Sequence, residues 1–193
     1  MDKPKRKFAA RLRRFIPSRL ARRFVRKQDG AAAVEFALVA VPFLALTFAI
    51  LETALVFFAG QTLEAAVTDS ARLIMTGQAQ TANYTASDFK NAVCARIYGL
   101  FDCAGGMYVD VKNYSNFSSI STTAPVTNGT FDSSKTGFQM AGPNCIQVVT
   151  LYYQWPIYVS MLGNNLSNLN GGNRLLAATA VFRNEPYGPA ACS

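Results

Sequence analysis

Residues 31–60 read AAAVEFALVAVPFLALTFAILETALVFFAG, and this stretch decides the fold. It contains no charged residue from Phe36 to Leu51, and extension to Gly60 adds only Glu52. At about 1.5 Å per residue, a helix of this length crosses a hydrocarbon core of roughly 30 Å. A secretory signal has a shorter apolar segment followed by a cleavage site of small residues, and no such site follows here. We therefore expect residues 31–60 to form one membrane-spanning helix.

The basic charge of the chain lies in the leader that precedes this helix. Residues 1–30 hold 12 of the 19 Lys and Arg but only two acids, so the leader has a net charge of +10. Residues 31–193 sum to −2, although the whole chain carries +8. Because basic flanks stay in the cytoplasm, we expect a cytoplasmic leader and a body on the other side of the membrane.

Apolar residues of the leader recur at spacings of three and four, with an interruption at Pro17. This pattern favours an amphipathic helix that lies on an anionic membrane surface. A solvated basic tail and an Arg-rich transit peptide are the alternatives.

Two residues are unusual inside the apolar stretch. Pro42 lacks a backbone N–H and is expected to kink the helix. Glu35 lies just before the uncharged run, and a carboxylate in hydrocarbon is costly unless it is paired or protonated. We therefore expect a functional role for Glu35, with a carboxylate that reaches the interface as the alternative. For Glu52, near the far side, solvation at the interface is a sufficient explanation.

The junction RKQDG-AAAVEFALV resembles the prepilin-peptidase signal of type IV pilin-like proteins. A basic leader, Gly30, three alanines and Glu35 precede the apolar helix, and glycine followed by alanines presents a thin backbone that a membrane protease can enter. Cleavage after Gly30 would make Ala31 the mature N-terminus and Glu35 the fifth mature residue. The new α-amine on Ala31 is the obvious counter-charge for Glu35, within one chain or between neighbours, and such a pair would hold helices in register.

More specifically, the chain resembles the TadE-like pseudopilins, the minor pilins of tight-adherence (Tad, or Flp) pilus systems. Such proteins open their membrane segment with a GAAAVEFALV-type run and end in a strand that closes on FRNEP, as residues 182–186 do here. The run GPNCIQVVTLYYQWPIY at residues 142–158 resembles the penultimate strand of the family, with Gly142 and Pro143 in reversed order.

This resemblance implies a membrane-anchored minor pilin needed for pilus assembly or initiation and for surface adhesion. The implied partners are prepilin peptidase, other pilins and pseudopilins, the inner-membrane assembly platform and the lipid bilayer. The implied location is the bacterial inner membrane, with a periplasmic C-terminal domain that reaches the cell surface in the pilus. The resemblance implies no enzymatic activity and no cofactor.

Residues 61–193 are expected to form the periplasmic or extracellular domain. The helix is predicted to continue over 61–76 and to stop at Gly77, with a stripe that faces the core at Leu63, Val67, Ala71 and Ile74. Ser87 is expected to cap a second helix that runs from Asp88 to Gly99. Its predicted apolar face consists of Phe89, Val93, Ile97 and Tyr98.

Alternation and β-branched content predict strands at 107–112, 145–153 and 174–183, the first with Met107, Val109 and Val111 inward. Residues 113–144 are rich in Ser, Thr, Asn and Gly and indicate a long loop or a poorly formed hairpin. The expected fold class is α+β, of type IV pilin-like form. A three- to four-stranded antiparallel sheet would lie on the second half of the long helix.

All four cysteines follow the membrane stretch, as expected for two disulfides in an oxidising compartment. Of three connectivities we favour Cys94–Cys103, which closes a short turn, with Cys145–Cys192, which pins the C-terminus to the penultimate strand. Free buried thiols are the alternative. The spacing does not fit a zinc site, so no metal is expected.

The absence of histidine from the sequence excludes Ser-His-Asp and Cys-His catalysis. The acids of the body are scattered and its lysines lack an S-x-x-K partner, so a hydrolase is disfavoured. The body is not basic, so we expect no nucleic-acid partner. The alternative to a pilin is an uncleaved single-pass membrane protein whose external domain scaffolds a secretion or assembly machine.

Overall fold

The computed structural model describes residues 30–97, 99–103, 105–159, 165–188 and 192. The predictions for the leader and for Tyr98 lie outside these residues. The chain divides into two compact units, one that ends at Leu46 and one that begins at Thr47. The element order is a long helix, two short helices, a strand, a small hairpin and two long strands, which is the α+β class expected from the sequence.

The long helix α2 spans Ala31–Met75 and contains Pro42. Its predicted inward stripe is confirmed in the second unit, where Leu63, Val67, Ala71 and Ile74 are buried. After Met75 the chain turns at Gly77, whose φ of +77° is the left-handed conformation that glycine adopts without strain. The short helix α3 (Gln78–Thr81) follows directly.

The sheet consists of β1 (Met107–Tyr114), β4 (Ile146–Pro156) and β5 (Asn173–Arg183), in the order β1-β4-β5. Both pairings are antiparallel, with Val111 opposite Val149 and Thr150 opposite Thr179. Each strand is longer than its prediction. The central strand β4 is buried over its first eight residues, because both of its faces are covered.

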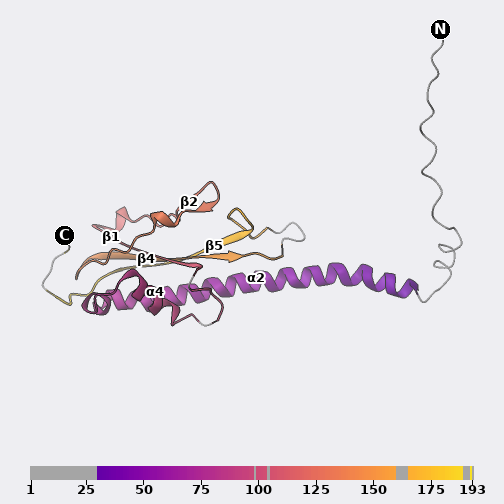
Figure 1. Cartoon of the computed structure of the whole chain (residues 1–193), viewed down its shortest axis with the longest axis horizontal. Coiled ribbons are helices and arrows are strands. Elements are labelled where there is room, and N and C mark those ends of the chain that lie inside the picture. Colours follow the sequence, from indigo (N-terminus) through magenta and orange to yellow (C-terminus); the bar gives the residue numbers. More distant parts are fainter. Residues whose placement is uncertain (1–29, 98, 104, 160–164, 189–191, 193) are drawn as a thin grey trace, which may run out of the picture. The chain divides into compact units, whose positions relative to one another are not determined.

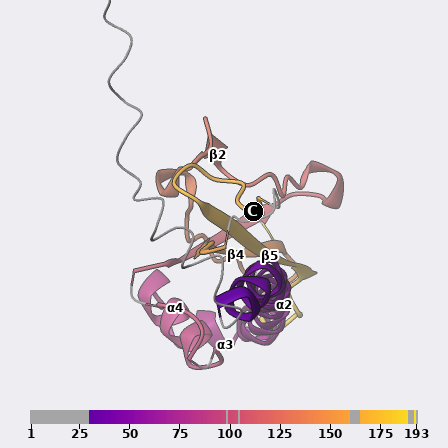
Figure 2. The same ribbon diagram turned by 90° about the vertical axis from the view of Figure 1, so that its right-hand side faces the viewer.

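Two apolar cores lie on opposite faces of this sheet. Figure 2 shows α2, α3 and α4 (Ala86–Cys94) on one side of the sheet and the β2 segment on the other. The larger core joins α2 and α4 to the sheet, with Phe89, Leu63 and Leu151 among its fully buried side chains. The smaller core packs Phe131 and Leu169 against Tyr152.

The segment 113–144 contains several short ordered elements. They are a hairpin of β2 (Val126–Thr127) and β3 (Thr130–Phe131) and two 3-10 turns, Phe117–Ser119 and Ser133–Lys135. The sequence left two alternatives for this segment, a long loop or a poorly formed hairpin, and the structure shows a hairpin of two-residue strands between irregular stretches.

The start of α4 differs from its prediction. Thr85, not Ser87, is the cap: its hydroxyl accepts from the backbone N–H of Asp88, whose carboxylate accepts from the N–H of Thr85 in return. Both Thr and Ser are competent caps. Thr85 caps the helix because the acidic residue Asp88 lies three positions further on, where its carboxylate can complete a capping box. The helix also ends earlier than expected, at Cys94.

Candidate functional site

The surface of α2 carries an unusual amount of exposed apolar area. Fourteen large apolar side chains between Val34 and Phe58 are between 49% and 75% exposed. In the first unit they include Phe36 and Phe43, and in the second unit Phe57 and Phe58. Water-soluble proteins rarely leave so large a contiguous apolar patch uncovered, so this surface is suited to lipid or to other helices.

By length and composition, α2 is the one helix among the described residues that could cross a membrane, and the most apolar window of the helix is not buried at all. This finding is consistent with a single-pass membrane protein. The helix α2 is apolar around its circumference over this stretch, as a lipid-facing or helix-packed segment requires.

The predicted processing site lies at the start of α2. Gly30 is exposed and immediately precedes Ala31, the first residue of the helix. A Cβ atom built on Gly30 would meet no other atom within 4 Å. The side chain of Glu35 is also exposed in the first unit. The helix continues through Pro42, which leaves the carbonyl of Leu38 without its usual N–H partner four residues on.

Glu52 has a different role from the one expected. Its residue is only 7% exposed, so the expectation of a solvated interfacial carboxylate is wrong. Its two carboxylate oxygens accept hydrogen bonds from the backbone N–H groups of Tyr158, at 2.5 Å, and Val159, at 2.9 Å. These residues follow the end of β4, so Glu52 ties α2 to the end of the sheet. The only sequence signal was a carboxylate amid apolar residues, which a buried acceptor also requires.

The C-terminal motif at residues 182–186 holds the opposite end of the domain together. The side chain of Phe182 packs against the larger core, and the backbone N–H of Glu185 donates to the carbonyl of Met75 at the end of α2. Asn184 is buried, and its amide donates to the carbonyls of Ala141 and Gly142. The motif therefore joins β5, α2 and the loop before β4.

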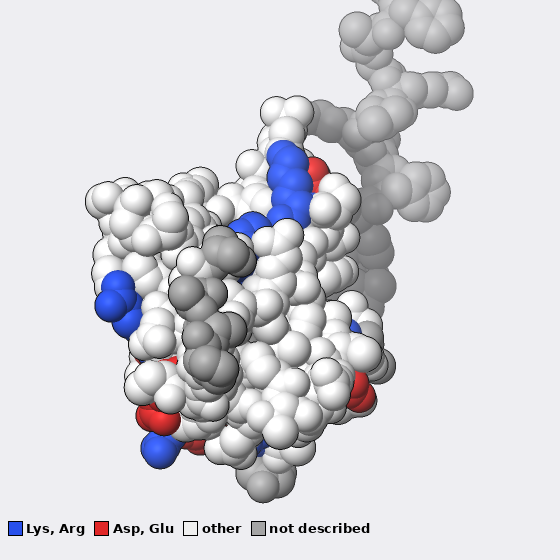
Figure 3. All heavy atoms as spheres, turned by 90° about the vertical axis from the view of Figure 1, so that its left-hand side faces the viewer, with Lys and Arg blue, Asp and Glu red and all other residues white. Residues whose placement is uncertain are grey.

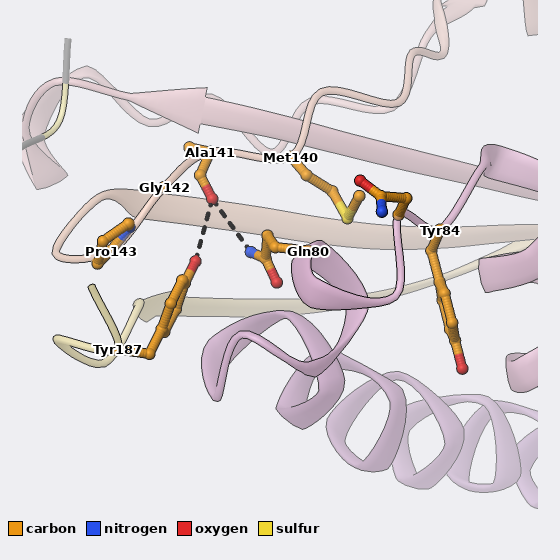
Figure 4. A pocket seen from close by; sticks show the side chains of 8 residues that line it. Gln80, Tyr84, Met140, Ala141, Gly142, Pro143 and Tyr187 are labelled. Atoms are coloured by element: carbon orange, nitrogen blue, oxygen red, sulfur yellow. Dashed lines mark hydrogen bonds between the residues drawn. The ribbon is translucent and has the colours of Figure 1, made fainter. Parts of the chain in front are cut away.

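A shallow pocket lies beside this junction (Figure 4). The side chains of Gln80 and Tyr187 point toward Ala141, whose carbonyl accepts from both, at 3.0 and 3.3 Å. Burial raises the pKa of the Tyr187 phenol above its ordinary value. The pocket is lined by uncharged side chains, among them Tyr84 and Met140, and the buried Oε1 atom of Gln80 has no hydrogen-bond partner among the described residues.

The disulfides have the pairing favoured from the sequence. Cys94 bonds to Cys103 with Cα atoms 5.9 Å apart, and Cys145 to Cys192 with Cα atoms 5.1 Å apart. The first links the end of α4 to the turn before β1. The second attaches the C-terminal tail to the residue that precedes β4.

Charged and metal-ligating side chains are dispersed among the described residues. Among the described residues, no three His, Cys, Asp or Glu side chains come together in a way that could hold a metal. On the face drawn in Figure 3, most of the surface is uncharged, and basic and acidic side chains are interspersed.

These features define an α+β protein with one long apolar helix available to a membrane or to neighbouring helices. Residues 30–72 match the family model of TadE-like protein, so the resemblance seen in the sequence is confirmed over this segment. The matched segment starts at Gly30 and covers most of α2. Over this segment the chain is therefore similar to the TadE-like proteins of Tad pilus systems. Searches of curated proteins and of solved structures found no match.

Proposed function

We propose that this chain is a minor pilin, or pseudopilin, of a tight-adherence pilus, anchored in the inner membrane until it is incorporated and needed for pilus assembly or initiation and for surface adhesion. The exposed apolar surface of α2 between Val34 and Phe58 is the observation that carries this proposal. A filament built from packed helices buries such a surface, and lipid covers it before assembly.

Prepilin peptidase is the proposed processing enzyme, with cleavage between Gly30 and Ala31. The exposure of Gly30 and the free space around it support this assignment. The leader would then stay in the cytoplasm, and the mature chain would carry a positive α-amine at the first residue of α2.

Glu35 is the proposed assembly contact. Its exposed carboxylate lies one helical turn from Ala31, on a helix surface that otherwise offers apolar side chains. In hydrocarbon such a carboxylate gains most from a positive partner, and the α-amine of a neighbouring chain supplies one. The pair would select the axial register of one subunit against the next.

N-terminal sequencing of protein from cells with an active prepilin peptidase tests the processing step. The mature protein is expected to begin at Ala31, and Gly30→Leu is expected to keep the leader. Because a side chain at position 30 meets no neighbour, Gly30→Leu is expected to leave the fold unchanged. A wild-type chain that still begins at Met1 would contradict cleavage and would favour an uncleaved membrane scaffold.

Glu35→Gln tests the assembly contact. The variant is expected to insert in the membrane at wild-type levels but to be depleted from sheared pili. Glu64→Gln is the matched control, because Glu64 is an exposed glutamate further along α2. Equal amounts of both variants in the pilus fraction would refute the role of Glu35.

A further inference from the structure

The outer edge of β5 is open along most of its length. β5 pairs with β4 from Asn173 to Arg183. In a β-strand, the backbone N–H and C=O groups of successive residues point alternately toward one neighbouring strand and toward the other. The hydrogen bonds at the two ends of β5 show which residues point toward β4. The carbonyl of Gly172 accepts from Ile157, and the N–H of Asn184 donates to the carbonyl of Cys145. Even-numbered residues therefore direct their backbone groups toward β4, and odd-numbered residues direct them outward.

The first outward groups of β5 have partners within the domain. The carbonyl of Asn173 accepts from the N–H groups of Asn168 and Leu169, and the N–H of Leu175 donates to the side chain of Asn168. Farther along, the backbone groups of Ala177, Thr179, Val181 and Arg183 have no hydrogen-bond partner within the described ranges. These four residues are exposed. We call their outward backbone groups the β5 edge.

The other edge of the same sheet is covered at its middle, beside Val111. The N–H of Val111 in β1 donates to the carbonyl of Gly137, and the carbonyl of Val111 accepts from Gln139, both at 2.8 Å. The buried carboxylate of Asp110 holds this covering segment by accepting from the N–H of Gly137. No comparable segment pairs with β5 between Ala177 and Arg183 among the described residues.

The β5 edge also lacks the usual features that keep other strands away. Proteins blunt an open edge with lysine, proline, a bulge or a very short strand. β5 has 11 residues, pairs with β4 without a bulge, and contains neither lysine nor proline. Its charged side chains are Arg174 and Arg183, near its two ends, and neither forms a salt bridge with another described residue.

We propose that the β5 edge binds an extended segment of a different protein chain as an added antiparallel strand. The main-chain groups of Ala177, Thr179, Val181 and Arg183 would supply its hydrogen bonds. The small and β-branched side chains along this edge suit uncharged β-branched residues on the added strand. The guanidinium of Arg183, which has no salt bridge to another described residue, favours a carboxylate beside it, near the N-terminal end of that strand.

A second copy of this chain is a poor occupant for a geometric reason, which rests on the proposed membrane anchoring. β5 begins beside Val159, which bonds to Glu52, and ends beside Glu185, which bonds to Met75. Within the second unit, β5 therefore runs in the same direction as α2 (Figure 1). Antiparallel pairing of two β5 edges would turn the two α2 segments in opposite directions, which copies inserted in one membrane with one orientation cannot do.

Amide hydrogen exchange of the full chain in detergent micelles tests this proposal. The probe is an acetylated peptide, DTVTITVT, at millimolar concentration, because one short added strand binds weakly. Exchange at Ala177, Thr179 and Val181 is expected to slow roughly tenfold, whereas the already bonded even-numbered amides stay unchanged. The same peptide with alternate amides N-methylated is expected to have no effect. Absence of slowing with the unmodified peptide would overturn the proposal.

Two variants separate edge binding from other binding. Thr179→Pro removes one outward N–H that β4 does not use, and is expected to abolish the slowing at the neighbouring outward amides. The wild-type chain is expected to bind the peptide with aspartate more tightly than one with lysine in its place, and Arg183→Glu is expected to reverse this preference. Lys135→Glu makes the same charge change beside β1 and is expected to keep the wild-type preference. An Arg183→Glu variant with unchanged preference would overturn the charge assignment.

The identity of the partner is tested separately by a benzoylphenylalanine photo-crosslinker at position 181 in cells. A homodimer adduct would overturn the choice of a different chain. An adduct with a different chain that disappears in the Thr179→Pro background would support that choice. The peptide assay requires neither cleavage nor pili, so its result is independent of the proposed function.

Discussion

Replacing Glu52 by alanine is expected to lower the free energy of unfolding of the second unit by about 2–4 kcal/mol. The carboxylate is buried and accepts two backbone hydrogen bonds, from Tyr158 at 2.5 Å and Val159 at 2.9 Å. A hydrogen bond to a charged group contributes about 1.5–3 kcal/mol. Because Tyr158 is 83% exposed, water replaces part of what is lost, and the expected sum is reduced accordingly.

Thermal unfolding of the full chain in detergent, followed by near-UV circular dichroism, measures this loss. For a unit of this size, about 1 kcal/mol shifts the midpoint by about 2–4 °C, so the expected decrease is roughly 4–16 °C. Glu52→Gln keeps one acceptor oxygen and is expected to lose about half as much.

The matched control is Glu64→Ala on the same helix. Glu64 is exposed, and its side chain has one long contact, 3.4 Å from the amide of Gln61. Its loss is expected to stay within about 0.5 kcal/mol. If Glu52→Ala were no more destabilising than Glu64→Ala, the assigned link between α2 and the end of β4 would be wrong.

Three further predictions concern the rest of the domain. Gly77→Ala is expected to lower the free energy of unfolding in urea more than Gly99→Ala does. Both glycines have positive φ, so each substitution costs about 1–2 kcal/mol of backbone strain. Only at Gly77 would the new Cβ also lie 2.6 Å from the ring of Tyr187. Thr85→Ala is expected to cost about 1 kcal/mol and to raise the pKa of Asp88 in an NMR titration, because hydrogen bonds from Thr85 lower it. Because the pKa of Asp88 is lowered in the folded state, its contribution to stability is present above about pH 4 and is lost as the pH falls through that folded-state pKa. Cys192→Ser is expected to cost about 4 kcal/mol by the loop-entropy model, and a stability equal to wild type would contradict the role of that disulfide.

Local patterns in the sequence determined the main elements of this protein. The continuous apolar run could only be a long helix, and the spacing of Leu63, Val67, Ala71 and Ile74 marked the face that the domain covers. Alternation and β-branched content located the three strands, although each extends beyond its predicted ends. The junction at Gly30 and Glu35 was visible because composition changes abruptly there, and the family match begins at that point.

The cap of α4 was also encoded locally, although the prediction placed it at Ser87. Thr85 and Ser87 are both competent caps, but only Thr85 has an acidic residue, Asp88, three positions further on, as a capping box requires. The burial of Tyr187 against Gly77 required contacts between residues far apart in the chain, which periodicity does not report.

The sequence by itself therefore determined the separation of a basic leader from an apolar helix and the positions of the helices and strands, because each of these depends on residues only a few positions apart. Only the tertiary structure decided that Glu52 is a buried acceptor at the end of β4 and that β4 lies between β1 and β5. It also decided that segment 137–139 lies beside β1, where it pairs with Val111, and not beside β5. The physical reason is that strand order and the burial of a polar group depend on long-range pairing, and many pairings are compatible with the same local pattern.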